Sequence, residues 1–492
     1  MSRHTHVLAN STNANSPDAG RQARNQRIVA ALAMMTVAAL YLTGLTRMGM
    51  YSVDEPRYAD IARTMARTGD WITPKLWGQP WFEKPPLLYW MSAVGFKLGL
   101  GDDLSPRLPL ALLSVSFLVF FYRRLSVVFD RPAAGYATAM LATSAGWLAY
   151  SHVAVTDVPL TACFTAALLL ALPGSDGAGE RGPARVAAAL ALGLAMLAKS
   201  LPPLILFVPI LVWDRRNWRR WFLSWPLVVF LAVATPWHWI SVVRNGQEFL
   251  YELFIRQQFG RFFSAERQHQ QPWWFYAKYA PVLLFPWFPL LPLLFRKGWT
   301  GTEETRDSIR KMASVVVFGF IFFSGGVNKL PGYVLPLLPA TCALLGAALA
   351  SMEPARRSRL FIAPVALLGI LPFAAAVVTR KAGEPIPWLA VLASVAVCGA
   401  IGLFLSSTSR PFILTTLLAA VAFCGLEASL FPVLDGLYSA RTLWQAGNTS
   451  CVSPVVPRGT LLGLYYYAGK VLPDCGIVDK NAVLPAASGQ KK

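Results

Sequence analysis

Residues 51–89 read YSVDEPRYADIARTMARTGDWITPKLWGQPWFEKPPLLY, a run of acids, bases and aromatics that follows one apolar stretch and precedes another. Charged side chains near a bilayer must be paired, hydrated or functional, because an isolated ion there is costly. The rest of the chain is mostly apolar, since 55% of its 492 residues are hydrophobic and only 14% are charged. Soluble domains carry about 25% charged residues, so the composition indicates a polytopic membrane protein.

The net charge of +20 would suggest a nucleic-acid partner in a soluble protein. Here the Lys and Arg residues stand in short clusters between apolar runs, a pattern that orients membrane proteins in the bilayer. We therefore expect contact with membrane lipids and no nucleic-acid partner.

Apolar runs predict an all-α protein with about thirteen transmembrane helices, each near the length of about 20 residues that a bilayer requires. The first run is 28–45. The others lie near 106–122, 133–151, 157–173, 185–198, 201–213, 221–243, 278–295, 311–325, 331–351, 359–378, 386–406 and 411–432.

The basic clusters test this count. With thirteen spans they all fall on one side of the membrane, which the positive-inside rule makes the cytoplasmic side. Three parts follow: a disordered cytoplasmic tail (1–27), a membrane domain (28–433) and a small C-terminal region (434–492). The long loops 50–105 and 244–277 then lie outside the cytoplasm with the C-terminal region.

The C-terminal region carries two further expectations. Its segment LLGLYYYAGKV (461–471) is a plausible strand. Cys451 and Cys475 can form a disulfide there if the region lies outside the cytoplasm, where thiols are oxidised.

Two amphipathic helices are expected in the first outer loop. One begins near Pro56 and ends at Gly69, residue types common at these two positions. Its apolar and charged residues fall on opposite faces, which predicts a helix lying on the membrane surface. A second such helix is predicted over 87–98.

Three acids are candidates for chemistry. Asp54 and Glu55 follow the first span, and Asp157 opens a later one. Each could simply cap a helix, since acids are favoured at helix starts. The functional alternative is a carboxylate that accepts a proton or orients a cationic group. Two acids at the outer ends of different helices, in an acid-poor chain, favour a shared site.

Several cations also lie on the expected outer side, although the positive-inside rule places most Lys and Arg residues on the cytoplasmic side. Lys84 follows Glu83 and precedes two prolines that stiffen the backbone. Lys is a compact cation suited to a phosphate oxygen, although Lys84 could equally pair with Glu83 or a lipid phosphate. Arg256 and Lys329 lie in the later outer segments. An anionic, lipid-linked ligand would account for these charges.

Metal and nucleotide signals are weak or missing. His269 is the single histidine in either long outer loop, and such a residue is more often structural than a metal ligand. A Glu/His pair could still hold a divalent ion. The sequence has no HExxH, P-loop or dinucleotide fingerprint, so we expect no nucleotide cofactor.

Several motifs resemble one family of enzymes. VDEPRYADIAR and GDWITPKLWGQPWFEKPPLLYW in the first loop resemble the lipid A aminoarabinose transferases, which belong to the protein mannosyltransferase-like glycosyltransferases of the GT-C class. Further matches, in the family's order, are TDVPL (156–160), RQHQQPWWFY (267–276) and NKLPGYVLPLLPA (328–340). The sequence departs from the family at Ser200, where relatives usually have Gly, and in its shorter tail.

The resemblance implies a GT-C fold and assigns roles by position. Asp54 matches an essential first-loop acid, and Asp157 a second acid near the cavity. The expected substrate-binding residues are Glu55, Arg57, Tyr58, Lys84, Arg256, Lys329 and Tyr333. Glu83 and His269 match a metal-binding pair, so a divalent ion (Zn or Mg) is admitted without being required for catalysis.

The function that the resemblance implies is transfer of a sugar from a polyisoprenyl (undecaprenyl) phosphate donor to an envelope acceptor. The site would face the periplasm of a bacterial inner membrane, with the N-terminus cytoplasmic. The nearest subgroup transfers aminoarabinose to lipid A. An alternative is a mannosyl or hexosyl transferase acting on protein, lipopolysaccharide core or polysaccharide. A lipid-linked sugar transporter is disfavoured, because transporters place ionisable residues near mid-membrane.

Overall fold

The structure is a computed structural model that describes residues 35–173, 181–263, 269–296, 301–381, 388–407, 411–447, 450–453 and 456–475. The predicted disordered tail (1–27) and the start of the first predicted span lie outside these residues.

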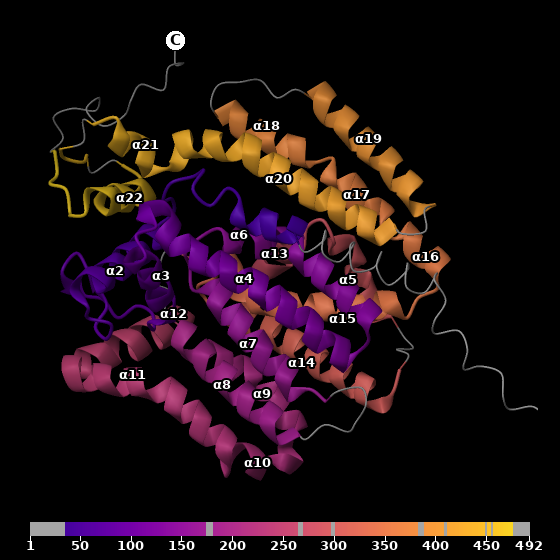
Figure 1. Cartoon of the computed structure of the whole chain (residues 1–492), viewed down its shortest axis with the longest axis horizontal. Helices are drawn as coiled ribbons and strands as arrows, with labels where there is room; N and C mark the ends of the chain where they lie inside the picture. Colours follow the sequence, from indigo (N-terminus) through magenta and orange to yellow (C-terminus); the bar gives the residue numbers. More distant parts are fainter. Residues whose placement is uncertain are drawn as a thin grey trace, which may run out of the picture.

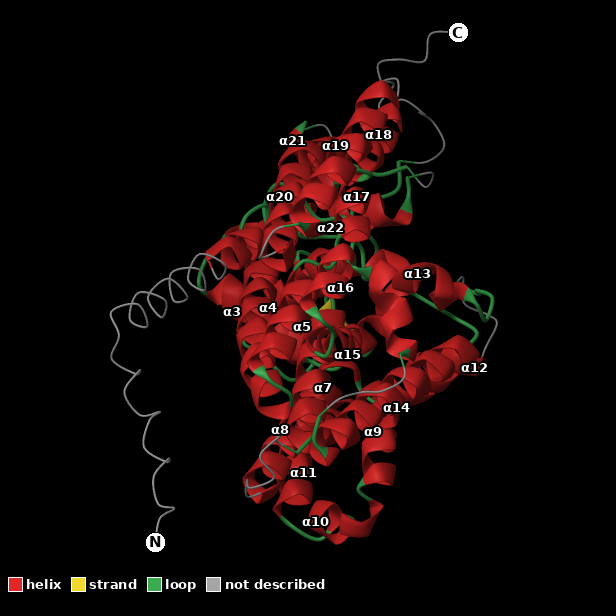
Figure 2. Ribbon diagram, turned by 90° about the vertical axis from the view of Figure 1, so that its right-hand side faces the viewer, coloured by secondary structure: helices red, strands yellow, loops and turns green. Residues whose placement is uncertain are grey.

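The described chain is almost entirely helical (Figure 2). In the first half the helices are α2 (Asp54–Thr68), α3 (Leu87–Lys97), α4 (Gly101–Val128), α5 (Arg131–Ala142), α6 (Ala145–Ser151), α7 (Asp157–Ala171), α8 (Arg181–Lys199), α9 (Pro202–Trp213), η1 (Arg215–Asn217), α10 (Arg219–Phe222) and α11 (Trp225–Leu250). In the second half they are η2 (Tyr251–Phe259), α12 (Gly260–Phe263), α13 (Phe275–Leu283), η3 (Phe288–Phe295), α14 (Glu303–Gly325), η4 (Pro331–Leu337), α15 (Leu338–Ala350), α16 (Pro354–Arg359), α17 (Ile362–Leu368), α18 (Leu371–Lys381), α19 (Trp388–Ser406), α20 (Pro411–Tyr438), α21 (Ala440–Gln445) and α22 (Arg458–Ala468). Strands β1 (Lys75–Leu76) and β2 (Gln79–Pro80) pair antiparallel.

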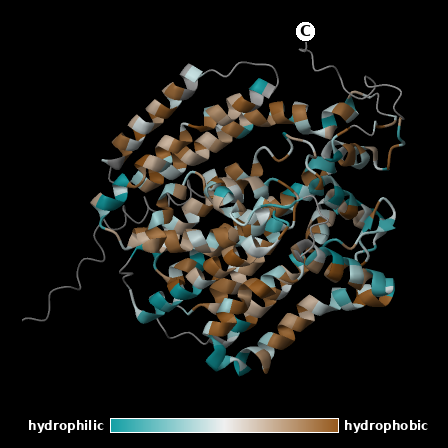
Figure 3. Ribbon diagram, turned by 180° about the vertical axis from the view of Figure 1, so that it is seen from behind, coloured by the Kyte–Doolittle hydropathy of each residue, from teal (hydrophilic) through white to brown (hydrophobic). Residues whose placement is uncertain are grey.

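Seven helices among the described residues are long and apolar enough to cross a membrane, or eight if α13 and η3, which meet at 113°, form one bent span. Hydrophobic residues predominate along these helices (Figure 3). Three shorter apolar helices also match predicted spans. The chain is thus a multi-pass membrane protein, but the count of thirteen is not confirmed. Several predicted spans are broken, because Pro, Gly and polar residues interrupt runs that hydropathy alone reads as continuous.

The core of the membrane domain is built around α15, which is buried along most of its length beside α5 (Figure 1). Gly346 makes this approach close, since a Cβ there would lie 2.5 Å from the carbonyl oxygen of Ala133. Small residues let membrane helices pack at such distances. On the outside, α11 exposes Trp239 and Val243, each 70% exposed, as expected for a surface in contact with lipid.

The first outer loop contains the two predicted helices, but α2 is packed differently from the prediction. It ends at Gly69, whose φ of 73° closes the helix, and α3 matches 87–98 within one residue. The helix does not lie with its polar face open to solvent. Its apolar face packs on α3, and on the polar face Arg63 donates to the carbonyl oxygen of Tyr466 in α22 at 2.7 Å.

The C-terminal region corrects a second expectation, because 458–468 form the helix α22 where a strand was predicted. Leu462 and Tyr466 lie one helical turn apart and both are buried, and Gly469, with φ of 68°, caps the helix. Cys451 and Cys475 are joined by a disulfide. In Figure 1 the yellow α22 lies beside α2, so this helix covers part of the first outer loop.

Candidate active site

Arg57 links two acids at the N-terminal end of α2. Its guanidinium donates to Asp54 and, at 2.8 Å, to Glu83, while its Nε donates to the carbonyl oxygen of Val53 at 2.9 Å. Burial lowers the pKa of Arg57, but the negative charge of Glu83, with Tyr58 and Asp54, raises this pKa by more than burial lowers it. The pKa of Arg57 therefore lies above its usual value. The guanidinium therefore stays charged and holds the Asp54 carboxylate, which is 39% exposed, at the protein surface.

Glu55 lies in the interior. Its side chain is fully buried and accepts hydrogen bonds from Arg107 at 2.7 and 2.8 Å and from the Ala154 backbone N–H at 3.0 Å. Arg107 also donates to the carbonyl oxygens of Leu45, Met48 and Gly49. With both carboxylate oxygens engaged, Glu55 is placed to hold α2, α4 and the preceding loop together instead of contacting substrate. The capping alternative also fails, because α2 begins at Asp54 and neither acid is its N-cap.

Asp157, the first residue of α7, faces a cation. The Lys199 ammonium donates to its carboxylate at 2.7 Å and lies 4.9 Å from the centre of the Tyr333 ring. The N-cap of α7 is Thr156, so Asp157 is not the capping residue. Ser200, which follows Lys199, has φ of 63°, a conformation that favours glycine. Gly, the residue expected here from the resemblance, adopts this conformation readily, and the turn fixes where α8 ends and thus where Lys199 lies.

Tyr150 connects the two candidate catalytic acids. Its hydroxyl lies within electrostatic reach of both Asp54 and Asp157. Gly332 in η4 packs against the same group, since a Cβ there would lie 2.7 Å from Asp157 Oδ1 and 2.8 Å from the Tyr150 hydroxyl. Segments from α6, α7 and η4 therefore meet beside Asp157, and Asp54 of the first loop acts on the same hydroxyl. The shared catalytic site stays a prediction.

A cavity of about 220 Å³ opens beside this group of residues. Lys84, Lys199 and Tyr333 line it together with the amides of Gln257 and Asn328. The rest of its wall is apolar and includes Leu160, Ile205, Phe259, Phe262, Phe322 and Phe323. The cavity thus combines cations with a hydrophobic wall, which suits an amphiphile with an anionic head.

Five of the expected substrate-binding residues do not line this cavity: Glu55 and Arg57, described above, and Tyr58, Arg256 and Lys329. Lys329 donates to the backbone carbonyl oxygens of Gln271 and Gly326. It thereby links the segment before α13 to the loop that follows α14. Arg256 is exposed and pairs with Glu252 at 2.9 Å. Tyr58 is buried against Tyr89, with ring centres 5.7 Å apart. Each of these three side chains is packed or paired within the protein, and its expected role in substrate binding stays a prediction.

The predicted metal pair receives no support from its surroundings. Glu83 is held by Arg57 at 2.8 Å and has Lys84 at 3.5 Å, while the His269 side chain is exposed. Among the described residues no three His, Cys, Asp or Glu side chains form a group that could hold a metal ion. A carboxylate already neutralised by cations is a poor ligand, so this donor set does not fit a divalent ion. The metal stays a prediction, and no step below depends on it.

Sequence reasoning missed Arg107 and Tyr150. Arg107 stands inside the helix α4, which is otherwise mostly apolar after its first turn, and an ionisable residue in such a place signals a buried partner. Its partner Glu55 lies 52 residues away, which no local pattern reveals. Tyr150 carries no signal of its own in the sequence.

Replacing Gly332 by alanine should lower the rate of the reaction at this site at least tenfold, because the added methyl group would push apart the Asp157 carboxylate and the Tyr150 hydroxyl. Gly325→Ala is the matched control, since a Cβ at Gly325 meets nothing within 4 Å. Turnover and thermal stability of both purified variants check this. Equal turnover in the two variants would contradict the convergence described above.

Comparison with known proteins agrees with this architecture. A family model described as dolichyl-phosphate-mannose-protein mannosyltransferase matches residues 83–240. An undecaprenyl phosphate-alpha-4-amino-4-deoxy-L-arabinose arabinosyl transferase of Pseudomonas fluorescens (strain Pf0-1) is 31% identical over 323 residues, which cover 63% of this chain and 57% of that protein. The counterpart from Pseudomonas aeruginosa PAO1 is 30% identical over 337 residues, covering 66% and 60%. The chain thus spans less than two thirds of the length of these curated relatives.

The crystal structure of ArnT from Cupriavidus metallidurans bound to undecaprenyl phosphate has a similar fold. The TM-score is 0.72 at 24% identity, over 91% of this chain and 86% of that one. This likeness confirms the GT-C fold. By sequence the chain is thus similar to the aminoarabinose transferases and to the mannosyltransferase family model, and by structure it has the GT-C fold.

Proposed function

We propose that the protein is an inner-membrane glycosyltransferase that moves a sugar from a polyisoprenyl-phosphate donor to an envelope acceptor. The observation that carries the proposal is the cavity, where Lys84 and Lys199 stand beside a wall rich in phenylalanine. A lipid phosphate needs both features, because its head must be paired with cations while its isoprenoid chain stays out of water.

The chemistry follows from these groups. The bond between the sugar's C1 and the phosphate oxygen breaks, the polyisoprenyl phosphate leaves, and C1 forms a new bond to the acceptor oxygen. Lys84 and Lys199 stabilise the charge that develops on the leaving phosphate. An acceptor hydroxyl would give its proton to Asp54, whereas a phosphate acceptor has no proton to lose and Asp54 would orient it.

The best candidate reaction is transfer of aminoarabinose to lipid A. The printed names of the relatives, which refer to an undecaprenyl phosphate-linked aminoarabinose, support this sugar and donor. The alternative is a mannosyl or hexosyl transferase acting on protein, lipopolysaccharide core or polysaccharide, which the mannosyltransferase family model favours.

We place the site and the C-terminal region in the periplasm and the N-terminus in the cytoplasm. The basic clusters of the short loops support this orientation by the positive-inside rule. The disulfide between Cys451 and Cys475 supports it independently, since disulfides persist in the periplasm and are rare in the cytosol.

Lys84→Ala should weaken undecaprenyl phosphate binding roughly 10- to 100-fold, the usual cost of losing a charge-assisted contact. Binding is measured on the full-length protein in nanodiscs. Lys97→Ala is the control, because Lys97 is an exposed cation at the end of α3 that does not line the cavity. Equal affinities of the two variants for undecaprenyl phosphate would contradict the proposal that Lys84 binds the phosphate of the donor.

Mass spectrometry of lipid A tests the acceptor. Cells lacking the protein should lose an aminoarabinose adduct, and the wild-type chain but not Asp54→Ala should restore it. Unchanged lipid A in the null strain would reject this acceptor and direct the search to other envelope glycans.

A further inference from the structure

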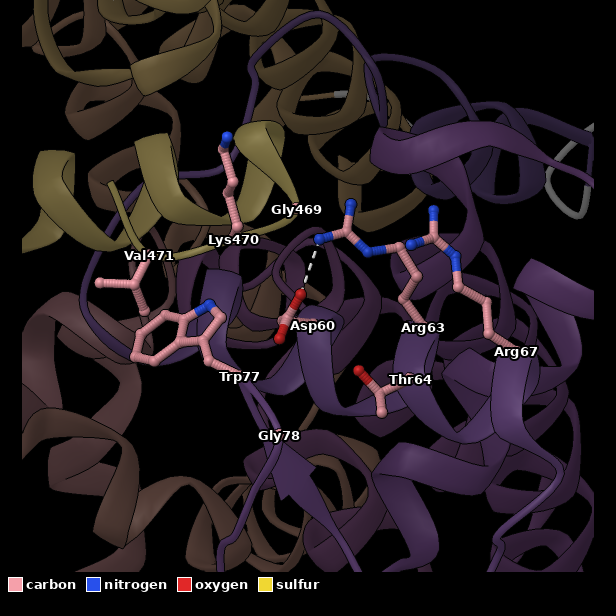
Figure 4. A pocket seen from close by; sticks show the side chains of 9 residues that line it. All are labelled: Asp60, Arg63, Thr64, Arg67, Trp77, Gly78, Gly469, Lys470 and Val471. Atoms are coloured by element: carbon pink, nitrogen blue, oxygen red, sulfur yellow. Dashed lines mark hydrogen bonds and ion pairs between the residues drawn. The ribbon is translucent and has the colours of Figure 1, made fainter. Parts of the chain in front are cut away.

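A second cavity, of about 340 Å³, lies between α2 and the segment that follows α22 (Figure 4). Arg63 and Arg67 from α2 form one side, Lys470 and Val471 another, and Trp77 from the β1–β2 turn a third. None of these residues lines the donor cavity. The pocket thus joins two neighbouring parts of the first loop to a segment that follows α22, all within the regions expected on the outer side.

The pocket carries a net positive charge. Its one acid, Asp60, is neutralised by Arg63 at 2.6 Å. Arg67 and Lys470 are exposed, and neither has an ion-pair partner among the described residues. Figure 4 shows their side chains arising from different walls of the pocket. Two such cations beside a hollow can hold an anion from two directions, which favours a phosphate group.

Trp77 gives the pocket an aromatic side. It stands in the two-residue turn between β1 and β2 with φ of 50°, followed by Gly78 with φ of 85°. Both residues of a two-residue hairpin turn adopt positive φ, so the turn sets this conformation, although a bulky residue rarely occupies it. The indole ring packs edge-on against Tyr465, 5.3 Å between centres. An aromatic face beside cations is suited to the apolar face of a charged sugar.

The pocket also lies within reach of the candidate active site. Asp60 and Arg67 are 6 and 13 residues beyond Asp54 on the same helix, about 9 to 20 Å along its axis at 1.5 Å per residue. A ligand with two linked sugars and separate phosphates could therefore occupy both places. The α2 helix would fix their spacing.

We propose that this pocket binds a phosphorylated sugar in the head group of the acceptor, at a distance from the sugar or phosphate that is modified. This inference rests on the proposed glycosyltransferase function and adds a specificity-determining subsite to it. Arg67 and Lys470 bind the phosphate, and Trp77 packs against the sugar ring. The pocket would thus select acceptors that carry a second anionic group.

The test uses the full-length protein in phosphatidylcholine nanodiscs. The probes are lipid A with two phosphates, lipid A with one phosphate, phosphatidylglycerol and inorganic phosphate. The double variant Arg67→Ala/Lys470→Ala should bind the two-phosphate lipid A roughly 10- to 100-fold more weakly than wild type. The control Lys97→Ala, an exposed cation outside the pocket, should bind it as wild type does.

A second variant separates packing from charge. Trp77→Gly relieves the backbone strain of the turn while removing the indole, so a loss of lipid A binding without a lower melting temperature supports the aromatic contact. The proposal also requires that wild type prefer the two-phosphate lipid A over the one-phosphate form and over phosphatidylglycerol. Equal binding of these lipids by wild type, or inorganic phosphate binding that is as tight as lipid A binding and is lost in the double variant, would assign the pocket to anions in general and overturn the proposal.

Undecaprenyl phosphate binding, measured in the same preparations, separates the two hypotheses. If wild type and double variant bind it equally but also bind lipid A equally, the subsite is wrong and the glycosyltransferase stands. If wild type fails to bind undecaprenyl phosphate, the proposed function fails, and the subsite proposal fails with it.

Discussion

Replacing Asp54 by asparagine is expected to lower kcat of sugar transfer by about 10²- to 10⁴-fold, the usual contribution of a positioned acid or base. The Asp54→Asn change keeps the size of the side chain, and the amide oxygen can still accept a hydrogen bond from Arg57, so the fold should be retained. The variant loses the negative charge that accepts a proton or orients the acceptor. Steady-state transfer from an undecaprenyl-phosphate sugar to lipid A, with melting temperature in parallel, measures the effect.

The control is Asp307→Asn on α14. Asp307 is 33% exposed and pairs with Lys311 at 2.7 Å, a setting close to that of Asp54, but unlike Asp54 it is not among the charged groups that act on the Tyr150 hydroxyl. Its variant should transfer sugar at the wild-type rate. Equal rates for both variants would remove Asp54 from the reaction.

Removing Glu55 should destabilise the protein by about 3–5 kcal/mol, because Arg107 would be left as an unpaired buried charge. Glu55→Ala also removes the acceptor for the Ala154 backbone N–H. The free energy of unfolding, from denaturant titration of the detergent-purified protein, should fall by this amount. A double variant, Glu55→Met with Arg107→Met, should recover part of the loss because no unpaired charge remains.

The exposed pair of Glu303 and Arg310 provides the comparison. Their atoms are 3.1 Å apart, but Glu303 is 65% exposed, and exposed pairs contribute less than about 1 kcal/mol. Glu303→Ala should therefore change the stability very little. A similarly small loss in Glu55→Ala would show that Glu55 does not hold α2 and α4 together.

Local signals predicted the local parts of the structure. Gly69 correctly marked the end of α2, and the apolar pattern of 87–98 correctly marked α3. Asp157 was expected at the outer start of a helix, and α7 begins there. Each of these features depends on residues within one or two turns, where capping and periodicity act.

The errors came from contacts between distant segments. The charged face of α2 was expected to face solvent, because no residue close to Arg63 in the sequence indicates that Tyr466 contacts the Arg63 side chain. No local pattern showed that Arg107, from another helix, is the partner of Glu55, and the expected role of Glu55 in substrate binding stays a prediction. In the C-terminal region, a run of leucines and tyrosines suggested a strand, although Gly469 was available as a helix stop.

The hydrogen bond from Arg63 in α2 to the carbonyl oxygen of Tyr466 in α22 has a consequence for biosynthesis. The two residues are separated by 403 positions, so α2 receives this support only after nearly the whole chain has been translated and inserted. Asp54 has been synthesised long before α22 is. Until α22 has been added, α2 is not yet held between α3 and α22. Completion of the candidate site is therefore tied to the synthesis of α22, and chains that end before α22 would leave the ribosome without this support for α2.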